Sequence, residues 1–490
     1  MRVSFCSLFL PLLDLQLVSS RSMPLLETRA REKNVNVVET YTIPDGVDKS
    51  TAFNVTVRVP GGKWRNIDVY KPKVVQTNIF TGSTAKKDSS MVYFDFSGSV
   101  EVSATYNNGE VTEARIRPDS LGNIPGINGA SVNFTLDQPR NVVLQINDDI
   151  FDVLHIFTNP IEDDAPSADD PDILIYGRGS HKLSEPLNIS SGQTLYLAGG
   201  SVVSLPGINF QNVSNASIRG RGVLATTSST AISVIRSQGI TIDGVIGINV
   251  LPRSYQSSDV TIRNFRALSS VQWGDGIDIF CSKNVFIDNV FMRNSDDCFA
   301  IYNHRDDWYG DNSNITLQNS VLWADVAHPI NMGTHGNTEN PETTDGVIIR
   351  NIDILDQHEK QVDYQGCIAI NAGDGNLIQN VIVDDVRVED IRLGQLVNLR
   401  VKFNKKYNTS PGRGIRNVTI QNLVYDGTQA LTSIMSGYDG TRTIDGVTFR
   451  NLTINGLAIN DKMKKPSWYL TSDYIPMYVN EHVYHVTFEA

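Results

Sequence analysis

The chain has 490 residues, 40% of them hydrophobic, which is enough for one large domain with a substantial core and a smaller domain beside it. Its formal charge of -12 and its pI near 5.2 argue against nucleic acid or an anionic membrane as the main partner. Both of those partners attract clustered Lys and Arg. Beyond the N-terminus, no stretch is long and apolar enough to span a membrane.

The N-terminus predicts a secreted protein. Residues 1–20 read as a signal peptide, since one Arg precedes a largely apolar run. Asn-x-Ser/Thr sequons are typical of a secreted glycoprotein, although Asn-rich strands also produce them by chance, and they begin at Asn54, Asn133, Asn188, Asn212, Asn215, Asn314, Asn408, Asn417 and Asn451. Removing the signal leaves Cys281, Cys298 and Cys367, whose wide spacing favours buried thiols over zinc ligands. One disulfide remains the alternative.

Residues 31–158 predict an N-terminal β-sandwich. The segment contains short alternating strands separated by turn residues, among them Ala52 to Val59, Met91 to Phe96, Val100 to Tyr106 and Val142 to Ile146. Residues 159–172 are acidic, rich in proline and without periodicity, which predicts a linker between domains.

Residues 173–490 contain an internal repeat that predicts a parallel β-helix. Its core is apolar-x-apolar-x-Asn, with the Asn at positions 264, 289, 319, 351, 422 and 451, and with Asp385 in the same place in one copy. The steps of 25 to 37 residues, the two-residue alternation and the fixed turn residue are typical of a solenoid with one coil per repeat. Longer steps predict loops that wall a cleft, at Tyr302 to Ser313, Gly333 to Asp345 and Phe403 to Arg413.

Three carboxylates recur at the spacing of one coil. Asp275 lies in the run Trp273-Gly-Asp-Gly276, and Asp296 and Asp297 follow about one repeat later. Aligning the coils by their Asn anchors places Asp275 over Asp296 or Asp297, about one strand spacing of ~4.8 Å away. Mutual repulsion should raise the pKa of at least one of them, which gives a protonated acid beside an ionised base. That division of labour is what glycoside hydrolysis needs.

A histidine extends the same column. Anchoring the following coil on its apolar residues places His328, in Ala327-His-Pro-Ile-Asn-Met-Gly333, beside the Asp pair. There an imidazole could steady a carboxylate or contact substrate. Turn or surface positions are the plainer interpretation of these side chains, but the Asn anchors already occupy the turns.

These motifs resemble glycoside hydrolase family 28, the polygalacturonases. Trp273-Gly-Asp-Gly276 is similar to that family's Asn-Thr-Asp-Gly, Asp296-Asp297-Cys298 to its Asp-Asp-Cys, and Ala327-His328-Pro329 to its Gly-His-Gly. The resemblance implies an all-β fold with a right-handed single-stranded parallel β-helix, and inverting hydrolysis. It also implies that Asp296 is the general acid, that Asp275 and Asp297 hold and activate water, and that His328 supports the site.

The resemblance departs from family 28 at the substrate carboxylate. The family's Arg-Ile-Lys motif should fall near Ile368 to Asn371, where no basic residue stands, and Arg400-Val-Lys402 lies one coil further on. The chain also resembles glycoside hydrolase family 49, dextranases and isopullulanase, in its N-terminal sandwich and its Asp pair. That resemblance implies a neutral α-glucan. The substrate is therefore expected to be a neutral or weakly acidic polysaccharide, such as one of the cell wall.

Further side chains are predicted to contact the sugar chain. The inserted loop after Tyr302 and the residue before the first Gly-Asp offer aromatic faces and polar groups, although packing within the loop is the alternative; the predicted substrate-binding set is Trp273, Asp278, Tyr302, His304, Trp308, Arg400 and Lys402. No metal or cofactor is predicted, and the protein is expected to be a monomer.

Two other functions fit a parallel β-helix. A pectate-lyase-like β-eliminase would use calcium, for which Asp306, Asp307 and Asp311 are the candidate ligands. It would also need a basic residue near the ion, and none accompanies the Asp cluster. A non-catalytic carbohydrate-binding solenoid would not require three converging carboxylates.

Overall fold

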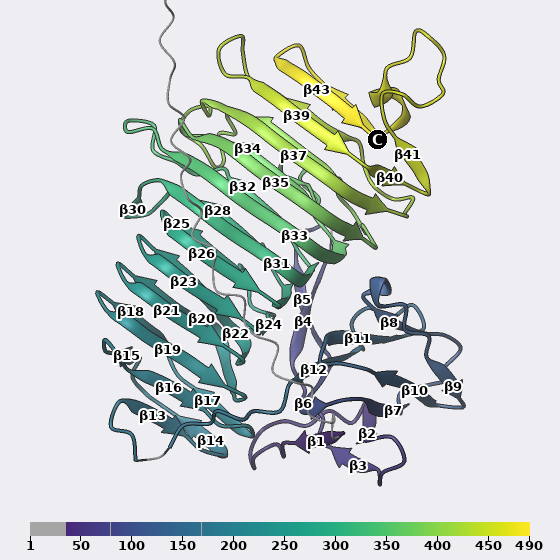
Figure 1. Ribbon diagram of the computed structural model, residues 1–490, viewed down its shortest axis with the longest axis vertical. Coiled ribbons are helices and arrows are strands. Elements are labelled where there is room, and N and C mark those ends of the chain that lie inside the picture. Colours follow the sequence, from purple (N-terminus) through teal and green to yellow (C-terminus); the bar gives the residue numbers. More distant parts are fainter. Residues whose placement is uncertain (1–35, 79, 168) are drawn as a thin grey trace, which may run out of the picture. The chain divides into compact units, whose positions relative to one another are not determined.

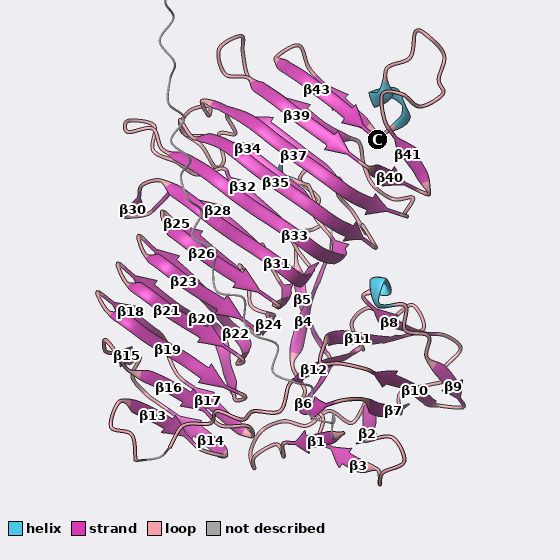
Figure 2. Ribbon diagram, viewed as in Figure 1, coloured by secondary structure: helices cyan, strands magenta, loops and turns pink. Residues whose placement is uncertain are grey.

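The computed structural model describes residues 36–78, 80–167 and 169–490, and residues 36–490 form one compact unit. It is built almost entirely from strands (Figure 2). The described part contains three short 3₁₀ helices, η1 (Asp119–Leu121), η2 (Val362–Tyr364) and η3 (Thr471–Tyr474). None of its helices is long and apolar enough to cross a membrane. The predicted signal segment, residues 1–20, lies outside the described residues.

Two five-stranded sheets make up the N-terminal part. The first has the order β1 (Val37–Thr40), β6 (Ser90–Ser97), β12 (Leu154–Asn159), β11 (Asn141–Ile146), β8 (Ala114–Arg117), and the second β3 (Arg65–Ile67), β2 (Phe53–Arg58), β7 (Val100–Tyr106), β10 (Ser131–Leu136), β9 (Gly126–Asn128). Alternating apolar residues of both sheets meet in one core, which is the arrangement of a β-sandwich. A separate hairpin, β4 (Lys73–Thr77) and β5 (Thr84–Asp88), belongs to neither sheet.

The rest of the chain winds into the predicted parallel β-helix, whose strands stack coil upon coil in Figure 1. One column of strands, the anchor face, carries the repeat: β13 (Ile173–Tyr176), β16 (Thr194–Leu197), β19 (Ser214–Gly220), β21 (Gln238–Asp243), β23 (Ser258–Arg263), β26 (Lys283–Asp288), β31 (Asn312–Ala324), β33 (Thr343–Gln357), β35 (Leu377–Val388), β37 (Gly414–Tyr425), β39 (Ile444–Arg450) and β43 (Val483–Glu489).

A second column of strands is the covered face, and in the later coils the long strands of the anchor face extend into it. It contains β14 (Gly179–Lys182), β17 (Ser201–Ser204), β20 (Val223–Ile235), β22 (Ile246–Tyr255), β24 (Arg266–Leu268), β27 (Phe291–Asn294), the second halves of β31, β33, β35 and β37, and β40 (Leu452–Ile454), which pairs antiparallel with β41 (Leu457–Ile459). Its outer side chains share an apolar cluster with the first N-terminal sheet, around Phe157, Phe291 and Trp323. The sandwich therefore covers a flank of the helix.

The third column, the site face, carries the predicted functional residues. It contains β15 (Leu187–Ile189), β18 (Ile208–Gln211), the second halves of β20 and β22, β25 (Ile277–Phe280), β28 (Phe299–Tyr302), β32 (Ile330–Gly333), β34 (Ile368–Ala372), β36 (Val397–Val401), β38 (Ser433–Ser436) and β42 (Met477–Val479). Apolar residues from all three columns fill the interior of the helix.

The predicted repeat is confirmed in register. Val260, Val285, Ile315 and the corresponding apolar residues of the later coils are paired one above another. Every predicted anchor, including Asp385, has a positive φ between 50° and 55°. Asn and Asp tolerate this left-handed conformation better than most residues, which explains why the anchor recurs.

The segment 159–172 is held against the helix. Tyr196 donates a hydrogen bond to Glu162 at 2.6 Å, and Arg219 forms an ion pair with Asp164 at 2.8 Å. Since residues 36–490 cluster as one unit, the division into a sandwich at 31–158, a linker at 159–172 and a helical domain at 173–490 stays a prediction.

Candidate active site

The predicted column of functional residues exists on the site face. Strands β25, β28 and β32 pair in register, and Asp275, Asp297 and His328 each stand two positions before the first paired residue. The backbone continues this register, because Gly276 donates its N–H to the Asp297 carbonyl at 2.7 Å and Cys298 donates to the His328 carbonyl at 2.8 Å. The residue of the Asp pair aligned with Asp275 is thus Asp297.

Both glycines that flank Asp275 are required by the close approach of the next coil. A Cβ on Gly276 would lie 2.0 Å from the carbonyl oxygen of Cys298, and a Cβ on Gly274 would lie 2.6 Å from the hydroxyl of Ser295. Any larger residue would push the coils apart. The two glycines therefore allow the next coil to approach the backbone on both sides of Asp275.

Asp297 is a buried carboxylate surrounded by donors. Its Oδ1 lies 2.6 Å from Nδ1 of His328 and accepts the His328 backbone N–H at 3.1 Å. Its Oδ2 accepts from the amide of Asn331 at 2.7 Å and from the hydroxyls of Tyr302 at 3.1 Å and Tyr364 at 3.4 Å. Burial alone would raise the pKa of Asp297, but His328 and the other donors outweigh it and hold that pKa below the ordinary value. Asp297 is therefore kept ionised.

Asp296 has the opposite environment although it is the adjacent residue. Burial and the charge of Asp297 raise the pKa of Asp296 well above the ordinary value. The donor found for it is the backbone N–H of Asp297 at 3.0 Å, and within the described part of the chain no cation pairs with it. Its side chain is still partly exposed. Asp296 is thus a carboxyl group that favours its protonated form and can reach a ligand.

Asp275 shares the raised pKa of Asp296 but, unlike Asp296, has a cation beside it. Burial, followed by the charges of Asp278, Asp296 and Asp297, raises its pKa well above the ordinary value. Arg253 opposes that rise, because it forms ion pairs with Asp275 at 3.1 Å and with Asp278 at 3.0 Å. Asp278 itself is buried, with its second oxygen unpartnered among the described residues. It acts here as the counter-ion of Arg253, which stands directly below it in the preceding coil.

Aromatic rings line the neighbouring column of the site face. Tyr255, Phe280 and Tyr302 are paired in register and stack at centroid distances of 4.7 and 5.3 Å. Trp308, on the small hairpin β29 (His304–Arg305) and β30 (Trp308–Tyr309), packs on Tyr255 at 4.8 Å. Trp273 stands apart from this stack and is 64% exposed.

The three predicted insertions meet one another. Gly310 of the first donates to Glu342 of the second at 2.6 Å, and Thr338 of the second lies 2.7 Å from the hydroxyl of Thr409 of the third. The third loop also brings Tyr407 onto Tyr364, with ring centroids 5.0 Å apart. The insertions therefore lie near one another, as predicted, and that they wall a cleft stays a prediction.

A loop of the following coil closes over the ionised carboxylate. Tyr364, in η2, packs edge-on against His328 at a centroid distance of 4.2 Å. Arg400 forms an ion pair with Asp363 at 2.5 Å, and Lys402 donates to the Asp363 carbonyl at 2.8 Å. Arg400 pairs in register with Asn371, which confirms that the basic residues lie one coil beyond the position expected from family 28.

Apart from Trp273, which is described above, the structure sorts the predicted site residues into three groups. Asp275, Asp296, Asp297, His328 and Tyr302 converge directly. Asp278, Arg400 and Lys402 contact the cluster only through other side chains, and Trp308 through the aromatic stack. His304, whose ring bonds the Asp306 carbonyl at 3.0 Å, lies on the small hairpin.

Sequence reasoning missed four side chains of the site: Arg253, Asn331, Glu359 and Tyr364. Two of them follow from the register, because Arg253 and Asn331 stand in the column of Asp278. The loop that carries Glu359 and Tyr364 lies outside the repeat and offers no such signal.

The candidate calcium ligands do not come together. Asp311 accepts the backbone N–H of Thr343 at 2.8 Å and so serves the contact between two insertions. Across residues 36–78, 80–167 and 169–490, no three His, Cys, Asp or Glu side chains form a group able to hold a metal ion. Cys281, Cys298 and Cys367 are buried free thiols, as expected.

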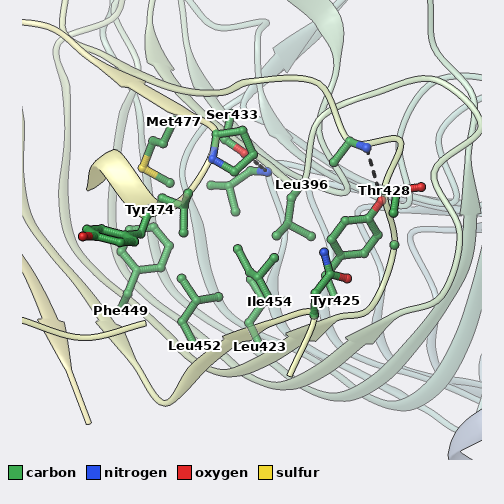
Figure 3. A pocket seen from close by; sticks show the side chains of 16 residues that line it. Leu396, Leu423, Tyr425, Thr428, Ser433, Phe449, Leu452, Ile454, Tyr474 and Met477 are labelled. Atoms are coloured by element: carbon green, nitrogen blue, oxygen red, sulfur yellow. Dashed lines mark hydrogen bonds between the residues drawn. The ribbon is translucent and has the colours of Figure 1, made fainter. Parts of the chain in front are cut away.

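Two cavities differ in chemistry. One, of 380 Å³, lies toward the C-terminal coils and is lined by apolar and uncharged side chains such as Leu423, Phe449 and Met477 (Figure 3). It contains no carboxylate or imidazole. The other, of 230 Å³, adjoins the carboxylate cluster and includes Trp273 and Glu359. The second cavity, therefore, is the one relevant to acid and base chemistry.

Comparisons with known proteins agree on the fold. No family model matches the sequence, and no curated protein matches it. The structure is similar to Dex49A from Penicillium minioluteum, with 12% sequence identity and a TM-score of 0.61 over 92% of this chain and 96% of that one. A family 28 exopolygalacturonase from Yersinia enterocolitica is more distant, at 11% identity and a TM-score of 0.46 over 79% of this chain and 96% of that one. The chain thus shares its overall fold with Dex49A.

Proposed function

We propose that the chain is a secreted, inverting glycoside hydrolase that cleaves O-glycosidic bonds of a polysaccharide. The observation that carries this proposal is the different surroundings of two adjacent carboxyl groups: Asp297 has five hydrogen-bond contacts, whereas Asp296 has one donor, the backbone N–H of Asp297. The pKa of Asp296 is raised and that of Asp297 is lowered, so both forms coexist over one pH range. Glycoside hydrolysis requires such a pair, one group to protonate the leaving oxygen and another to activate water.

Asp296 takes the role of general acid. Among the three carboxyl groups of the cluster it is the one without a cationic partner in the described chain, and its raised pKa favours the protonated form that an acid needs. Its partial exposure allows it to reach a glycosidic oxygen. Protonation of that oxygen lets the alcohol leave as the bond to the anomeric carbon breaks.

Asp275 and Asp297 share the handling of water. Asp297 is held by so many donors that it is a weak base, and it serves to bind the water and to supply negative charge. The pKa of Asp275 is raised and that of Asp297 is lowered, and the Arg253 cation beside Asp275 favours its ionised form. Asp275 is therefore the better proton acceptor of the two. His328 and Asn331 act as positioning residues for Asp297.

A neutral glycan suits the site better than a uronate polymer. Arg400 is already neutralised by Asp363. Lys402 is buried, and burial lowers its pKa to about 7, so it is a poor fixed cation. Two arginines lie closer to the cluster. Arg253 is engaged by Asp275 and Asp278, whereas Arg305 lies over the Tyr302 ring at 5.4 Å and forms no ion pair among the described residues. A substrate carboxylate at the cleavage point would be repelled by three carboxyl groups, and Arg305 is the arginine left to offset that repulsion.

Hydrolysis on a substrate panel tests the proposal. Purified protein is incubated with dextran, pullulan, polygalacturonate, rhamnogalacturonan and xylogalacturonan, with Asp296→Asn as the control. New reducing ends from a neutral glucan are expected for the wild type and not for the variant. Ultraviolet absorbance from an unsaturated product would reject hydrolysis in favour of β-elimination, and binding without product would identify a carbohydrate-binding solenoid.

Two further parts of the proposal have their own tests. Proton NMR of the first products gives the anomeric configuration, and retention would contradict the inverting mechanism. Expression in a eukaryotic host tests secretion and glycosylation through the mass and location of the product. Among the sequons, Asn408 is buried and donates to Asp374, so a glycan is not expected there.

A further inference from the structure

The N-terminal hairpin β4–β5 contributes to the cavity beside the carboxylate cluster. This cavity of 230 Å³ is lined on one side by Val75, Thr77 and Thr84 of the hairpin. The hairpin is tied to the β-helix where Lys360 donates to the Phe80 carbonyl at 3.4 Å. An isolated two-stranded ribbon is only marginally stable by itself, so these contacts matter for its position.

The opposite wall of the cavity comes from the catalytic coils. It includes Trp273, two residues before Asp275, and Ser295, directly before Asp296. Glu359 also lines it, and its charge is among the influences that raise the pKa of Asp296. The candidate acid and base do not line the cavity themselves, but they lie within one or two residues of its wall.

The lining combines an open aromatic face with polar atoms that have no partner. Trp273 is 64% exposed, although its indole lies in the cavity wall. The hydroxyl of Thr77 and Nδ1 of His358 are buried without a hydrogen-bond partner among the described residues. Buried polar atoms of this kind are normally satisfied, so these two lining residues have hydrogen-bonding capacity that is not used within the described chain. A sugar ring offers both an apolar face and hydroxyl groups.

We propose that this cavity is a subsite for one neutral pyranose unit of the glycan chain, and that the N-terminal hairpin forms one of its walls. The inference rests on the proposed hydrolase function and adds a role in substrate binding to the N-terminal part. The volume far exceeds what a single water molecule needs and suits one sugar ring. A concave, mainly apolar pocket with a few polar groups is typical of small-ligand sites.

Strand alternation in the hairpin supplies matched variants. Thr77 and Thr84 face each other across the two strands and line the cavity, whereas their neighbours Gln76 and Ala85 form the next pair and point to the other face. Thr77→Trp and Thr84→Trp fill the subsite. Gln76→Trp and Ala85→Trp add the same bulk to the same hairpin outside it, and thermal melting of all four confirms that they fold.

Kinetics on the glycan that the wild type cleaves provide the main test. The two cavity variants are expected to raise KM about tenfold or more while kcat at saturation changes less than threefold, and the two outer variants should match the wild type. Equal KM values in all four variants would overturn the subsite. A fall in kcat alone, without a change in KM, would also overturn it.

Binding measurements separate this inference from the proposed hydrolysis. Isomaltohexaose, maltohexaose and hexagalacturonate are titrated calorimetrically into the wild type and the four variants. If the wild type binds a hexasaccharide but cleaves none, hydrolysis fails, and a tenfold loss of affinity in the cavity variants alone still supports the subsite. If affinity is unchanged in the cavity variants, or if no hexasaccharide binds, the subsite is rejected.

Discussion

The same coils of the β-helix carry stacked polar side chains at two places with opposite hydrogen-bonding arrangements. One is the anchor edge, the turn with the Asn residues that follows the anchor-face strands, and the other is the site face. At the anchor edge, each amide finds a partner in the coil below: Asn289 donates to Asn264, Asn319 to Asp288 and Asn351 to Asn319, all at 2.7 Å. At the site face, Asp275, Asp296 and Asp297 stack carboxyl groups that repel one another.

The contrast shows that stacked polar side chains stabilise the solenoid at one place and repel one another at the other. An amide carries both a donor and an acceptor, so a stack of Asn residues satisfies itself at every coil. A stack of carboxylates cannot, and it needs Arg253 and His328 to hold it. Such conflict persists mainly at functional sites.

The largest loss of activity is expected from a change at Asp296, the carboxyl group without a cationic partner in the described chain. Asp296→Asn removes the proton donor and should lower kcat about 10²–10⁴-fold on the cleaved glycan. The matched control is Asp288→Asn at the anchor edge, where the new amide still offers an oxygen to Asn319. Initial rates of reducing-end formation measure both. Comparable losses in the two variants would remove the distinction between the edges.

The same substitution should stabilise the fold at neutral pH. The pKa of Asp296 is raised in the folded protein, so its favourable contribution is full below the unfolded pKa of about 3.9 and is lost as the pH rises through the folded value. Asn avoids that loss. The melting temperature of Asp296→Asn is expected to exceed that of the wild type at pH 8, and the difference should shrink toward pH 4.

The next effect concerns the support of the ionised carboxylate. His328→Ala removes two features that lower the pKa of Asp297, the imidazole charge and its hydrogen bond, so that pKa should rise. Because Asp297 must be ionised and held in place to bind the water, kcat should fall about ten- to a hundredfold, and the loss should be greatest at low pH. His328→Asn, which restores a donor, should recover part of the loss. A kcat close to that of the wild type at every pH would contradict this positioning role.

The fold was predictable because the β-helix repeats one local rule. The apolar-x-apolar-x-Asn pattern identifies both the register and the left-handed turn in the middle coils. The pattern did not identify two earlier coils, because Gly220 and Gly244 replace Asn at the same turn, with φ of 123° and 85°. Gly adopts that conformation freely but has no amide to reveal the ladder.

The site was predictable only where it follows the repeat. Asp275, Asp297 and His328 occupy one column, so coil spacing was sufficient to bring them together. The loop with Tyr364 belongs to no repeat, and its approach to Asp297 depends on how that loop folds back. The hairpin contact of Lys360 with Phe80 joins residues 280 positions apart, and neither partner carries a pattern that points to the other.

Substitutions at the anchor edge should lower the free energy of unfolding and leave kcat unchanged. Asn319→Ala removes a link of the ladder and places Ala at a φ of 52°, so we expect a loss of about 1–3 kcal/mol in the free energy of unfolding. Asn319→Gly relieves the backbone strain and should lose less. Urea denaturation measures both losses, and kcat should stay within twofold of the wild type. A stable variant with reduced kcat would reverse the assigned roles of the two edges.

The smallest effect is expected at the basic residues Arg400 and Lys402, and it tests whether the substrate is neutral or acidic. Arg400 is held by Asp363, so Arg400→Ala should change KM for a neutral glycan less than threefold. Arg253→Ala is the informative comparison, because it frees Asp275 from its cation and raises the pKa of that base. The fold decrease in kcat caused by Arg253→Ala should therefore exceed the fold increase in KM caused by Arg400→Ala. A large rise in KM for Arg400→Ala, seen with polygalacturonate and not with dextran, would show that the arginine leaves Asp363 to bind a uronate. The substrate would then be acidic despite the crowding of carboxylates at the cleavage point.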